Sequence, residues 1–272
     1  MPTEAVATRV EAVPGVPAQF GLPSVWTLVP TVDPHELAGV RWQPLSCAGA
    51  YVTPWCPGDI DEPYPKDFDS PEVVYAPPVT VYAGDVCSPI GSSRDEAVAR
   101  ARTALMLGEP RALEEWVWAN LLAAGAQDVT PATGAVGLAA GIGLVEGELG
   151  NLYGGIGVVH LPLSIMTPAG AAGALIQRGQ RMVTWAGNLV AGGAGYYLNT
   201  GPDGEEAPAG EAWVYASGPV VVRRQDPPDV IPDADNESID ITYNDRYVLA
   251  ERTTVVGVEC AIVATRVEVT CS

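Results

Sequence analysis

Three glycines, Gly141, Gly143 and Gly147, come nearest in this 272-residue chain to the spacing of a nucleotide-binding loop. In such a loop, glycines let the backbone approach a pyrophosphate, and the loop joins a strand to a helix. Here the third glycine stands one place too late, and no clear strand precedes the run. We therefore expect a flexible or closely packed backbone at these glycines, and no cofactor.

His160 is the residue best suited to acid–base chemistry, but it lies in an apolar run that ends at Pro162. A buried, hydrogen-bonded histidine is the common outcome in such a run. The chain has no Gly-x-Ser-x-Gly elbow and no cysteine close to a histidine in sequence, so we predict no catalytic residue. Spacing alone leaves a triad assembled in space open, and a soluble hydrolase that uses His160 and an aspartate stays an alternative.

Six acidic side chains between residues 226 and 240 would offer oxygen ligands to a divalent cation. The segment lacks the glycine and the ligand order of a calcium loop, so we expect a solvated acidic face and no metal site. The six residues are Asp226, Asp229, Asp233, Asp235, Glu237 and Asp240.

The five cysteines form no two-residue-spaced pair, and His35 and His160 lie in unrelated contexts, which argues against a zinc site. Their odd number favours reduced thiols over a disulfide framework. They are Cys47, Cys56, Cys87, Cys260 and Cys271.

The chain carries 33 acidic and 14 basic side chains, a formal net charge of −19. No basic cluster is larger than Arg223–Arg224, which argues against a protein that grips nucleic-acid phosphates. The opening residues lack a basic start followed by an apolar run, and no charge-free apolar stretch reaches the roughly eighteen residues of a membrane span. We therefore expect neither a secretory signal nor a membrane partner.

Fifteen of the 25 prolines lie in the first ninety residues. Proline fixes φ and restricts the residue before it, so this third is expected to be extended. Its large aromatic side chains, among them Trp26, Trp42 and Trp55, are interleaved with Val and Leu, unlike a disordered tail. We therefore expect this third to be buried against a neighbouring copy of the chain.

A long helix is predicted to begin after a serine N-cap at 92 or 93, because two acidic residues follow in the first turn. Apolar residues then recur at three-to-four spacing as far as Gly125, with a kink or break near Gly108 and Pro110. A second helix is expected over about 138–149, although its glycines weaken that pattern.

Short strands and helices are expected elsewhere. A buried strand is predicted over 155–162 and a helix over 167–179. Two strand-like runs, 72–75 and 79–82, fit a hairpin or loop that projects from the body. Further strands are expected over 182–191, 211–215, 218–224 and 247–269, the last bent or split in two, with an acidic loop over 225–245.

This order of elements resembles the major capsid proteins of tailed phages and the related encapsulins, which share the Hong Kong 97-type fold. Ala99-Arg-Ala-Arg-Thr-Ala-Leu105 and Glu114-Glu-Trp-Val-Trp-Ala-Asn-Leu121 look like the spine helix of that fold. Tyr153-Gly-Gly-Ile-Gly-Val-Val-His-Leu-Pro162 looks like the strand that leads to its axial-domain helix. Residues 218–224 and 250–264 resemble the closing peripheral-domain strands of actinobacterial-phage virion proteins.

The resemblance implies an α+β chain of five parts. These are an extended N-terminal arm (1–44), an E-loop-like hairpin (45–91), the spine helix and start of the peripheral domain (92–150), an axial-domain-like part (151–215) and closing peripheral-domain strands (216–272). It implies a structural subunit and no enzyme. Copies would assemble as pentamers and hexamers into an icosahedral virion shell, formed in the host bacterial cytoplasm.

The implied partners are other copies of the chain, with scaffold, portal or decoration proteins besides, and DNA enclosed without sequence-specific binding. Alternatives are an encapsulin-like compartment and another virion part, such as a tail or connector component. The expected contact residues between copies are the anchors Trp26, Trp42 and Trp55 and the helix arginines Arg94, Arg100, Arg102 and Arg111.

Lys66, the only lysine, falls in the E-loop-like segment. Some capsids of this fold join such a lysine to an asparagine of a neighbour. In this chain we expect a solvated loop cation, and a crosslink to Asn236 or Asn244, promoted by a carboxylate such as Glu237, is the alternative.

Overall fold

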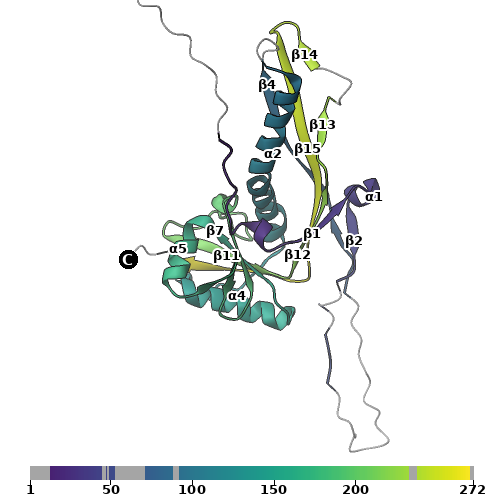
Figure 1. Cartoon of the computed structure of the whole chain (residues 1–272). Helices are drawn as coiled ribbons and strands as arrows, with labels where there is room; N and C mark the ends of the chain where they lie inside the picture. The colour runs from purple at the N-terminus through teal and green to yellow at the C-terminus, as the bar shows by residue number, and fades with distance from the viewer. Residues whose placement is uncertain are drawn as a thin grey trace, which may run out of the picture.

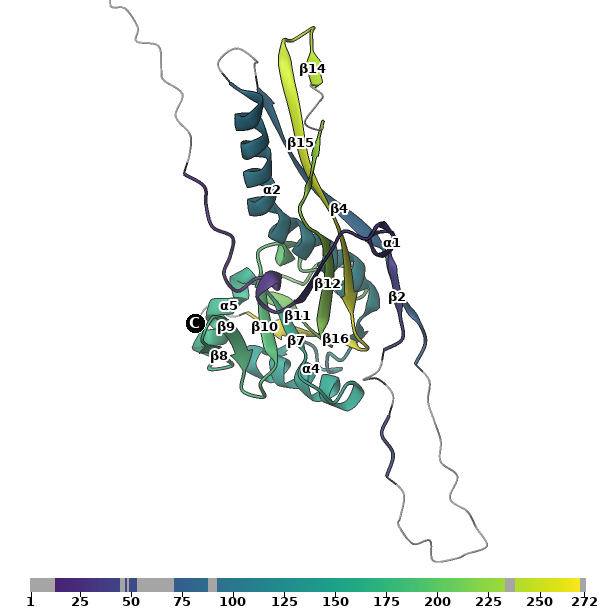
Figure 2. The same cartoon turned by 45° about the vertical axis from the view of Figure 1, so that its right-hand side comes forward.

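The computed structural model describes residues 13–44, 47, 49–52, 71–87, 92–232 and 238–269. Figure 1 shows an elongated half and a compact half. In the elongated half, helix α2 (Arg94–Val117) runs beside the long strands β4 (Pro78–Cys87) and β15 (Asp245–Val258), and Figure 2 shows the same arrangement after a 45° turn. The compact half is built on a second sheet, so the chain is α+β, as predicted.

Helix α2 begins where the sequence predicts, at a capping box. The Ser93 backbone N–H donates to Glu96 Oε2 (2.7 Å), and the Glu96 N–H donates to Ser93 Oγ (3.2 Å). The helix continues through Pro110 without a break. Leu105 before the proline and Leu113 after it are both buried, and this packing holds the helix together where the proline N–H is missing. A π-helical turn, Trp118–Leu122, and α3 (Ala123–Gly125) carry it on to Gly125.

The elongated half contains a sheet of six strands. Its path is β1–β12–β15–β13, and β4 and β14 also pair with β15. The strands not yet named are β1 (Thr27–Thr31), β12 (Val220–Gln225), β13 (Asp229–Ile231) and β14 (Ser238–Asp240). Two of them, β13 and β14, lie inside the segment that we expected to be an acidic loop.

The compact half contains an eight-stranded sheet of order β5–β16–β11–β7–β10–β9–β8, with β6 also paired to β16. Its strands are β5 (Gln127–Asp128), β6 (Val136–Gly137), β7 (Val158–Pro162), β8 (Leu175–Arg178), β9 (Arg181–Thr184), β10 (Leu189–Gly193), β11 (Glu211–Ser217) and β16 (Ile262–Glu268). Helices α4 (Leu138–Leu152) and α5 (Leu163–Ala171) pack on one face of this sheet.

Shorter elements complete the fold. Strands β2 (Val40–Trp42) and β3 (Val74–Ala76) form a two-stranded sheet at the base of the segment between them. The remaining pieces are the 3-10 turns η1 (Leu22–Ser24) and η3 (Tyr196–Leu198) and the short helix α1 (Pro34–Leu37).

The two halves share a core at the C-terminal end of α2. Leu113, Val117 and Trp118 pack there with Tyr215 of β11 and Val256 of β15. The chain passes from the first sheet to the second at the corner between β15 and β16, so the long closing strand predicted over 247–269 is two strands.

The expectation that the whole opening third is buried on a neighbour is wrong for much of that third. Leu22 and Val25 are buried in the shared core, β1 pairs in parallel with β12, and β4 pairs along its length with β15. The prolines are compatible with this burial, because β1 is an edge strand, where the N–H that Pro30 lacks is not needed. Residues 13–18 remain extended and exposed.

Two predicted boundaries in the compact half are also wrong. The helix predicted over 167–179 is α5, which ends at Ala171 before Gly173 at φ 71°, and residues 175–178 are strand β8. The strand predicted over 182–191 is two strands, β9 and β10, with Gly187 at φ 98° in the turn between them. In both places a glycine in the left-handed region ends the element.

The expectation of reduced thiols is wrong for one pair. Cys47 and Cys260 form a disulfide with their Cα atoms 5.5 Å apart. They are 213 residues apart in sequence, so no local spacing pattern marks them. Cys87 is a free buried thiol between α2 and β15, whereas Cys56 and Cys271 lie outside the described residues.

Candidate assembly surfaces

The predicted contact residues fall in different environments. Trp26 and Trp42 are partly buried on their own chain, whereas Trp55 and Lys66 lie outside the described residues, as do Asn236 and Glu237. Arg100 is engaged internally: its Nη2 lies 2.8 Å from Asp85 Oδ2 and donates to Ser92 Oγ. Arg94 donates to the Pro232 carbonyl, and the Arg111 guanidinium stacks 5.4 Å from the Tyr197 ring centroid. Arg102 is exposed on α2, where it lines a hollow.

This hollow, which we call the arginine hollow, lies between the middle of α2, the end of β12 and the middle of β15, and has a volume of about 530 Å³. Arg252 Nη1 lies 2.6 Å from Glu109 Oε2, Arg224 Nη1 lies 3.7 Å from the same oxygen, and Arg252 Nη2 lies 3.6 Å from Asp226 Oδ1. Proline, tryptophan and methionine side chains supply its apolar wall: Pro23, Trp26, Met106, Pro110, Pro227 and Pro228.

Glu109 is the most deeply buried group of the hollow, at 3 % exposure. Burial raises its pKa above the ordinary value, and the nearby Arg252 and Arg224 guanidinium groups only partly oppose that effect. Within the described part of the chain, Glu109 Oε1, Arg224 Nε and Arg252 Nε have no hydrogen-bond partner. A segment that offers both backbone donors and carboxylate acceptors would satisfy this set.

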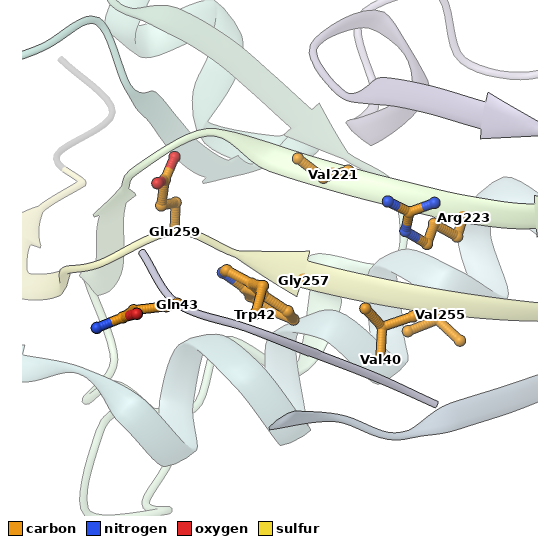
Figure 3. Close-up of a pocket in the computed structure, with 8 residues that line it drawn as sticks. All are labelled: Val40, Trp42, Gln43, Val221, Arg223, Val255, Gly257 and Glu259. Atoms are coloured by element: carbon orange, nitrogen blue, oxygen red, sulfur yellow. The ribbon is translucent and has the colours of Figure 1, made fainter. Parts of the chain in front are cut away.

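A second surface is the groove around Trp42, drawn in Figure 3. The groove measures about 270 Å³ and lies between β2 and the sheet strands β12 and β15. The indole lies against the backbone of Gly257, where any larger residue would collide with the ring. The predicted anchor Trp42 therefore packs β2 against the sheet of its own chain.

The third surface is the outer face of the β4–β15 ribbon, defined by Tyr82, Val86, Tyr247 and Leu249. Strand register places Val86 opposite Tyr247 and Tyr82 opposite Glu251. Tyr82 is 69 % exposed, Val86 56 % and Tyr247 39 %. Helix α2 covers only the opposite face, through Ala97, Ala101 and Leu105. Contiguous exposed apolar side chains of this kind mark interaction sites.

Sequence reasoning missed a buried carboxylate at the junction of the two halves. Glu114 of α2 is 1 % exposed, and its Oε1 accepts from the Leu22 N–H (2.8 Å) while Oε2 accepts from the Gly195 N–H (2.9 Å). Burial raises the pKa of Glu114, and these backbone donors oppose the shift. The only sequence signal is an acid between the apolar helix positions Leu113 and Val117.

His160 is fully buried, as predicted, and both of its ring nitrogens have partners. Ser217 Oγ donates to the Gly218 carbonyl, so His160 Nε2–H donates to Ser217 Oγ (2.9 Å) and Nδ1 accepts from Tyr196 Oη–H (3.1 Å). Burial lowers the pKa of His160 to about 3. The serine proton therefore points away from the histidine, the reverse of what an activated nucleophile requires.

The other candidate chemistry has structural explanations. Gly141 sits inside α4, where a side chain would collide with Val267 of β16, so this glycine serves close packing, as predicted. Among the described residues, no group of three or more His, Cys, Asp or Glu side chains could hold a metal ion. Part of the acidic segment, 233–237, lies outside those residues. No helix in the described ranges is long and apolar enough to cross a membrane.

No protein-family model and no curated protein match the chain. Solved structures do. The capsid of an empty GTA particle is similar over 97% of this chain and 95% of that one, with a TM-score of 0.58 and 12% identity. The SrpI encapsulin complex of Synechococcus elongatus is similar over 98% and 94%, with a TM-score of 0.58 and 14% identity.

A chain of Microbacterium phage Oxtober96 is similar over 96% of this chain and 91% of that one, with a TM-score of 0.54 and 12% identity. At these identities the likeness concerns the fold and extends over nearly the whole length. The chain has the Hong Kong 97-type fold, and that prediction is confirmed.

Proposed function

We propose that this protein is a structural subunit that assembles with itself, as pentamers and hexamers, into an icosahedral capsid shell around a DNA genome. The observation that carries the proposal is the full-length likeness in fold to the capsid chains of GTA particles. The exposed apolar face of the β4–β15 ribbon and the arginine hollow also support the proposal. On this proposal the protein works in the virion, after assembly in the cytoplasm of a host bacterium, and needs no catalytic residue.

The surfaces suit contacts between copies of an acidic chain. With a net charge of −19, copies repel at low salt, so association needs buried apolar area and local positive sites. The outer ribbon face supplies the apolar area. The arginine hollow gathers three of the few basic side chains, Arg102, Arg224 and Arg252, on one side of α2.

We assign the occupant of the hollow to the acidic residues 53–70 of a neighbouring copy. Residues 53–70 contain five acidic side chains and one lysine, besides Trp55, Tyr64 and Phe68. The exposed arm residues Val13 and Val16, each 92 % exposed, offer further area for a neighbour. Trp55 and Lys66 remain proposed contact residues on this basis. Scaffold, portal and decoration proteins would be further partners.

The test is negative-stain imaging and size-exclusion chromatography of the recombinant chain at low and high salt. We expect closed shells, formed more readily at high salt because screening weakens the repulsion between copies. A folded monomer that persists at high concentration in both conditions would overturn the proposal. Arg102→Glu should block assembly, whereas Arg178→Glu, with the same charge change at an exposed turn of the compact half, should not.

A shell that houses a protein cargo is the second candidate, because the SrpI encapsulin matches with the same TM-score as the GTA capsid. The contents of particles purified from cells separate the two. Nuclease-protected DNA supports the capsid, whereas a co-purified folded enzyme without DNA supports the compartment.

A further inference from the structure

Buried polar atoms without partners gather around the arginine hollow. Among the described residues, four such atoms are Glu109 Oε1, Arg224 Nε, Arg252 Nε and Thr254 Oγ1. Thr254 is fully buried, and Arg252 is 6 % exposed. Buried polar atoms in folded proteins are nearly always paired, so a group of four indicates a place that takes up an ion, a small ligand or ordered water.

Strand register brings these side chains together beneath α2. Arg252 and Thr254 are two residues apart on β15, and the alternating burial of that strand puts both on the face that Ala250 packs against α2. Arg224 of β12 is the register partner of Thr254, so its side chain lies on the same face. Glu109 of α2 reaches this face, since its Oε2 lies 2.6 Å from Arg252 Nη1.

The charge of the hollow favours an anion over water alone. Three guanidinium groups line it, those of Arg102, Arg224 and Arg252. Two carboxylates, Glu109 and Asp226, also line it, which leaves one positive charge in excess. Guanidinium N–H groups are the donors that proteins most often use for oxyanions. The unpaired Nε–H groups of Arg224 and Arg252 therefore suit the oxygens of an oxyanion.

Glu109 adds a requirement that only some oxyanions meet. An ionised carboxylate accepts hydrogen bonds and donates none, so an oxyanion without a proton would be repelled by Oε1. Inorganic phosphate keeps at least one proton near neutral pH, and its hydroxyl donates to a carboxylate while its other oxygens accept from guanidinium groups. Burial raises the pKa of Glu109, which favours the sharing of one proton between carboxyl and phosphate. Sulfate has a similar shape but lacks this proton.

The unpaired atoms lie just behind the wall of the hollow, so a ligand reaches them by rotation of side chains. Glu109 and Arg252 both line the hollow, and the last torsion of a glutamate side chain is soft. Arg102 and Met106 line it from the exposed side of α2 and can turn without disturbing the core. At about 530 Å³ the hollow has room for a phosphate and several waters, since one water takes about 30 Å³.

We propose that the arginine hollow is a binding site for hydrogen phosphate, whose oxygens accept from the arginines and whose hydroxyl donates to Glu109. The Thr254 hydroxyl, which both donates and accepts, joins the same network. The proposal concerns the single chain and does not depend on shell formation. If the chain does form shells, phosphate and residues 53–70 of a neighbouring copy would compete for the hollow.

Isothermal titration calorimetry of the full chain with phosphate and with sulfate tests the site, at pH 7 and at low, matched ionic strength. We expect one phosphate per chain and binding of sulfate at least about tenfold weaker, because sulfate leaves a buried acceptor without a donor. Glu109→Gln should bring the two affinities within about twofold of each other, since the amide N–H₂ can donate to either anion. Glu115→Gln, the same change at a residue outside the hollow, should keep the preference for phosphate.

Arg102→Gln tests the charge of the hollow without touching its buried part. Arg102 is exposed, so the variant should fold normally, as circular dichroism will check, and should bind both anions about two- to fivefold more weakly. Arg178→Gln at an exposed turn of the compact half is the control and should bind both as the unmodified chain does.

Three results would each overturn the phosphate site: no saturable binding of one phosphate per chain, equal binding of sulfate by the unmodified chain, or an undiminished preference for phosphate in Glu109→Gln. None of these measurements needs an assembled particle. A chain that binds phosphate but never forms shells would contradict only the proposed function, and a chain that forms shells but binds no phosphate would contradict only this site.

Discussion

The eight-stranded sheet is covered on both faces, whereas the β4–β15 ribbon is covered on one. In β7, Val158 belongs to the core shared with α2, and the next residue, Val159, belongs to the core under α4 and α5. In β4, Cys87 packs on α2 and its neighbour Val86 is 56 % exposed. Among the buried polar groups of the described residues, both ring nitrogens of His160 have partners, whereas Glu109 Oε1 of α2 and Thr265 Oγ1 of β16 have none.

This difference separates the side chains that stabilise the fold from the side chains that are available for contacts with a neighbouring copy. Strands buried on both faces read as apolar runs and commit their side chains to the core. The ribbon has one open apolar face, and the arginine hollow has buried hydrogen-bonding atoms without partners among the described residues, so both have unused binding capacity. Changes in the compact half and at the junction should therefore cost stability, and changes on the elongated half should cost assembly.

The largest loss of stability is expected from Trp118→Ala. Trp118 is 1 % exposed, packs at a tilt against the Tyr196 ring and edge-to-face with the Tyr215 ring, and donates its indole N–H to the Thr200 carbonyl. Removal of an aromatic ring from such a core costs about 3–5 kcal/mol. Trp185→Ala, at 75 % exposure, is the matched control and should change the free energy of unfolding little. Chemical denaturation measures the free energy of unfolding of both variants. Equal losses would contradict the assignment of stability to the core around Trp118.

Acid should destabilise the compact half through His160. Its pKa is about 3 in the folded chain against 6.5 unfolded. Between these values the unfolded chain binds the extra proton, so stability falls as the pH drops below 6.5, by about 1.4 kcal/mol per pH unit from this group.

Unfolding free energies between pH 7 and pH 4 for the unmodified chain and for His160→Gln check this. The variant should lose that part of the pH slope, while His35→Gln at the exposed α1 should keep it. Because Glu109 and Glu114 have raised pKa values and favour folding as pH falls, the difference between variants is the measurement. An unchanged slope in His160→Gln would show that His160 is protonated in the fold.

A smaller loss is expected from Glu114→Gln at the junction. The amide can accept through one oxygen only, so either the Leu22 or the Gly195 N–H loses its buried acceptor. An unpaired buried donor costs about 1–3 kcal/mol. Glu115→Gln, the neighbour that is only partly buried, is the control. Thermal unfolding of the two variants should differ, and the Glu114 variant should also loosen residues 13–25 in hydrogen exchange.

Local patterns predicted the regular elements well. The capping box of α2, the buried strand around His160 and the packing role of Gly141 depend on residues close in sequence, and each is confirmed. The Hong Kong 97-type architecture was recognisable from the order of these elements. Errors occurred where tertiary contacts decide, as at the proline-rich β1, whose edge position lets Pro30 sit in a strand.

The candidate surfaces were less predictable, because they join distant segments. The arginine hollow brings Arg102 of α2 together with Arg224 and Arg252 of two late strands. The disulfide joins Cys47 to Cys260 across 213 residues. Trp26 and Trp42 were expected to be anchors on neighbouring copies, and the structure packs both of them, partly buried, on their own chain.

The smallest effect on stability and a large effect on assembly are expected from Tyr82→Ser on the outer ribbon face. An exposed side chain away from special features changes stability by about 0.5 kcal/mol or less. If a neighbour covers this face, loss of the ring removes an aromatic anchor, and such anchors carry most of the binding energy of an interface. Analytical ultracentrifugation should then show folded subunits that assemble poorly. Trp185→Ala removes a comparable exposed ring from the compact half and should assemble normally. If both variants fail to assemble, or if Trp185→Ala alone fails, the assembly surface is not confined to the elongated half.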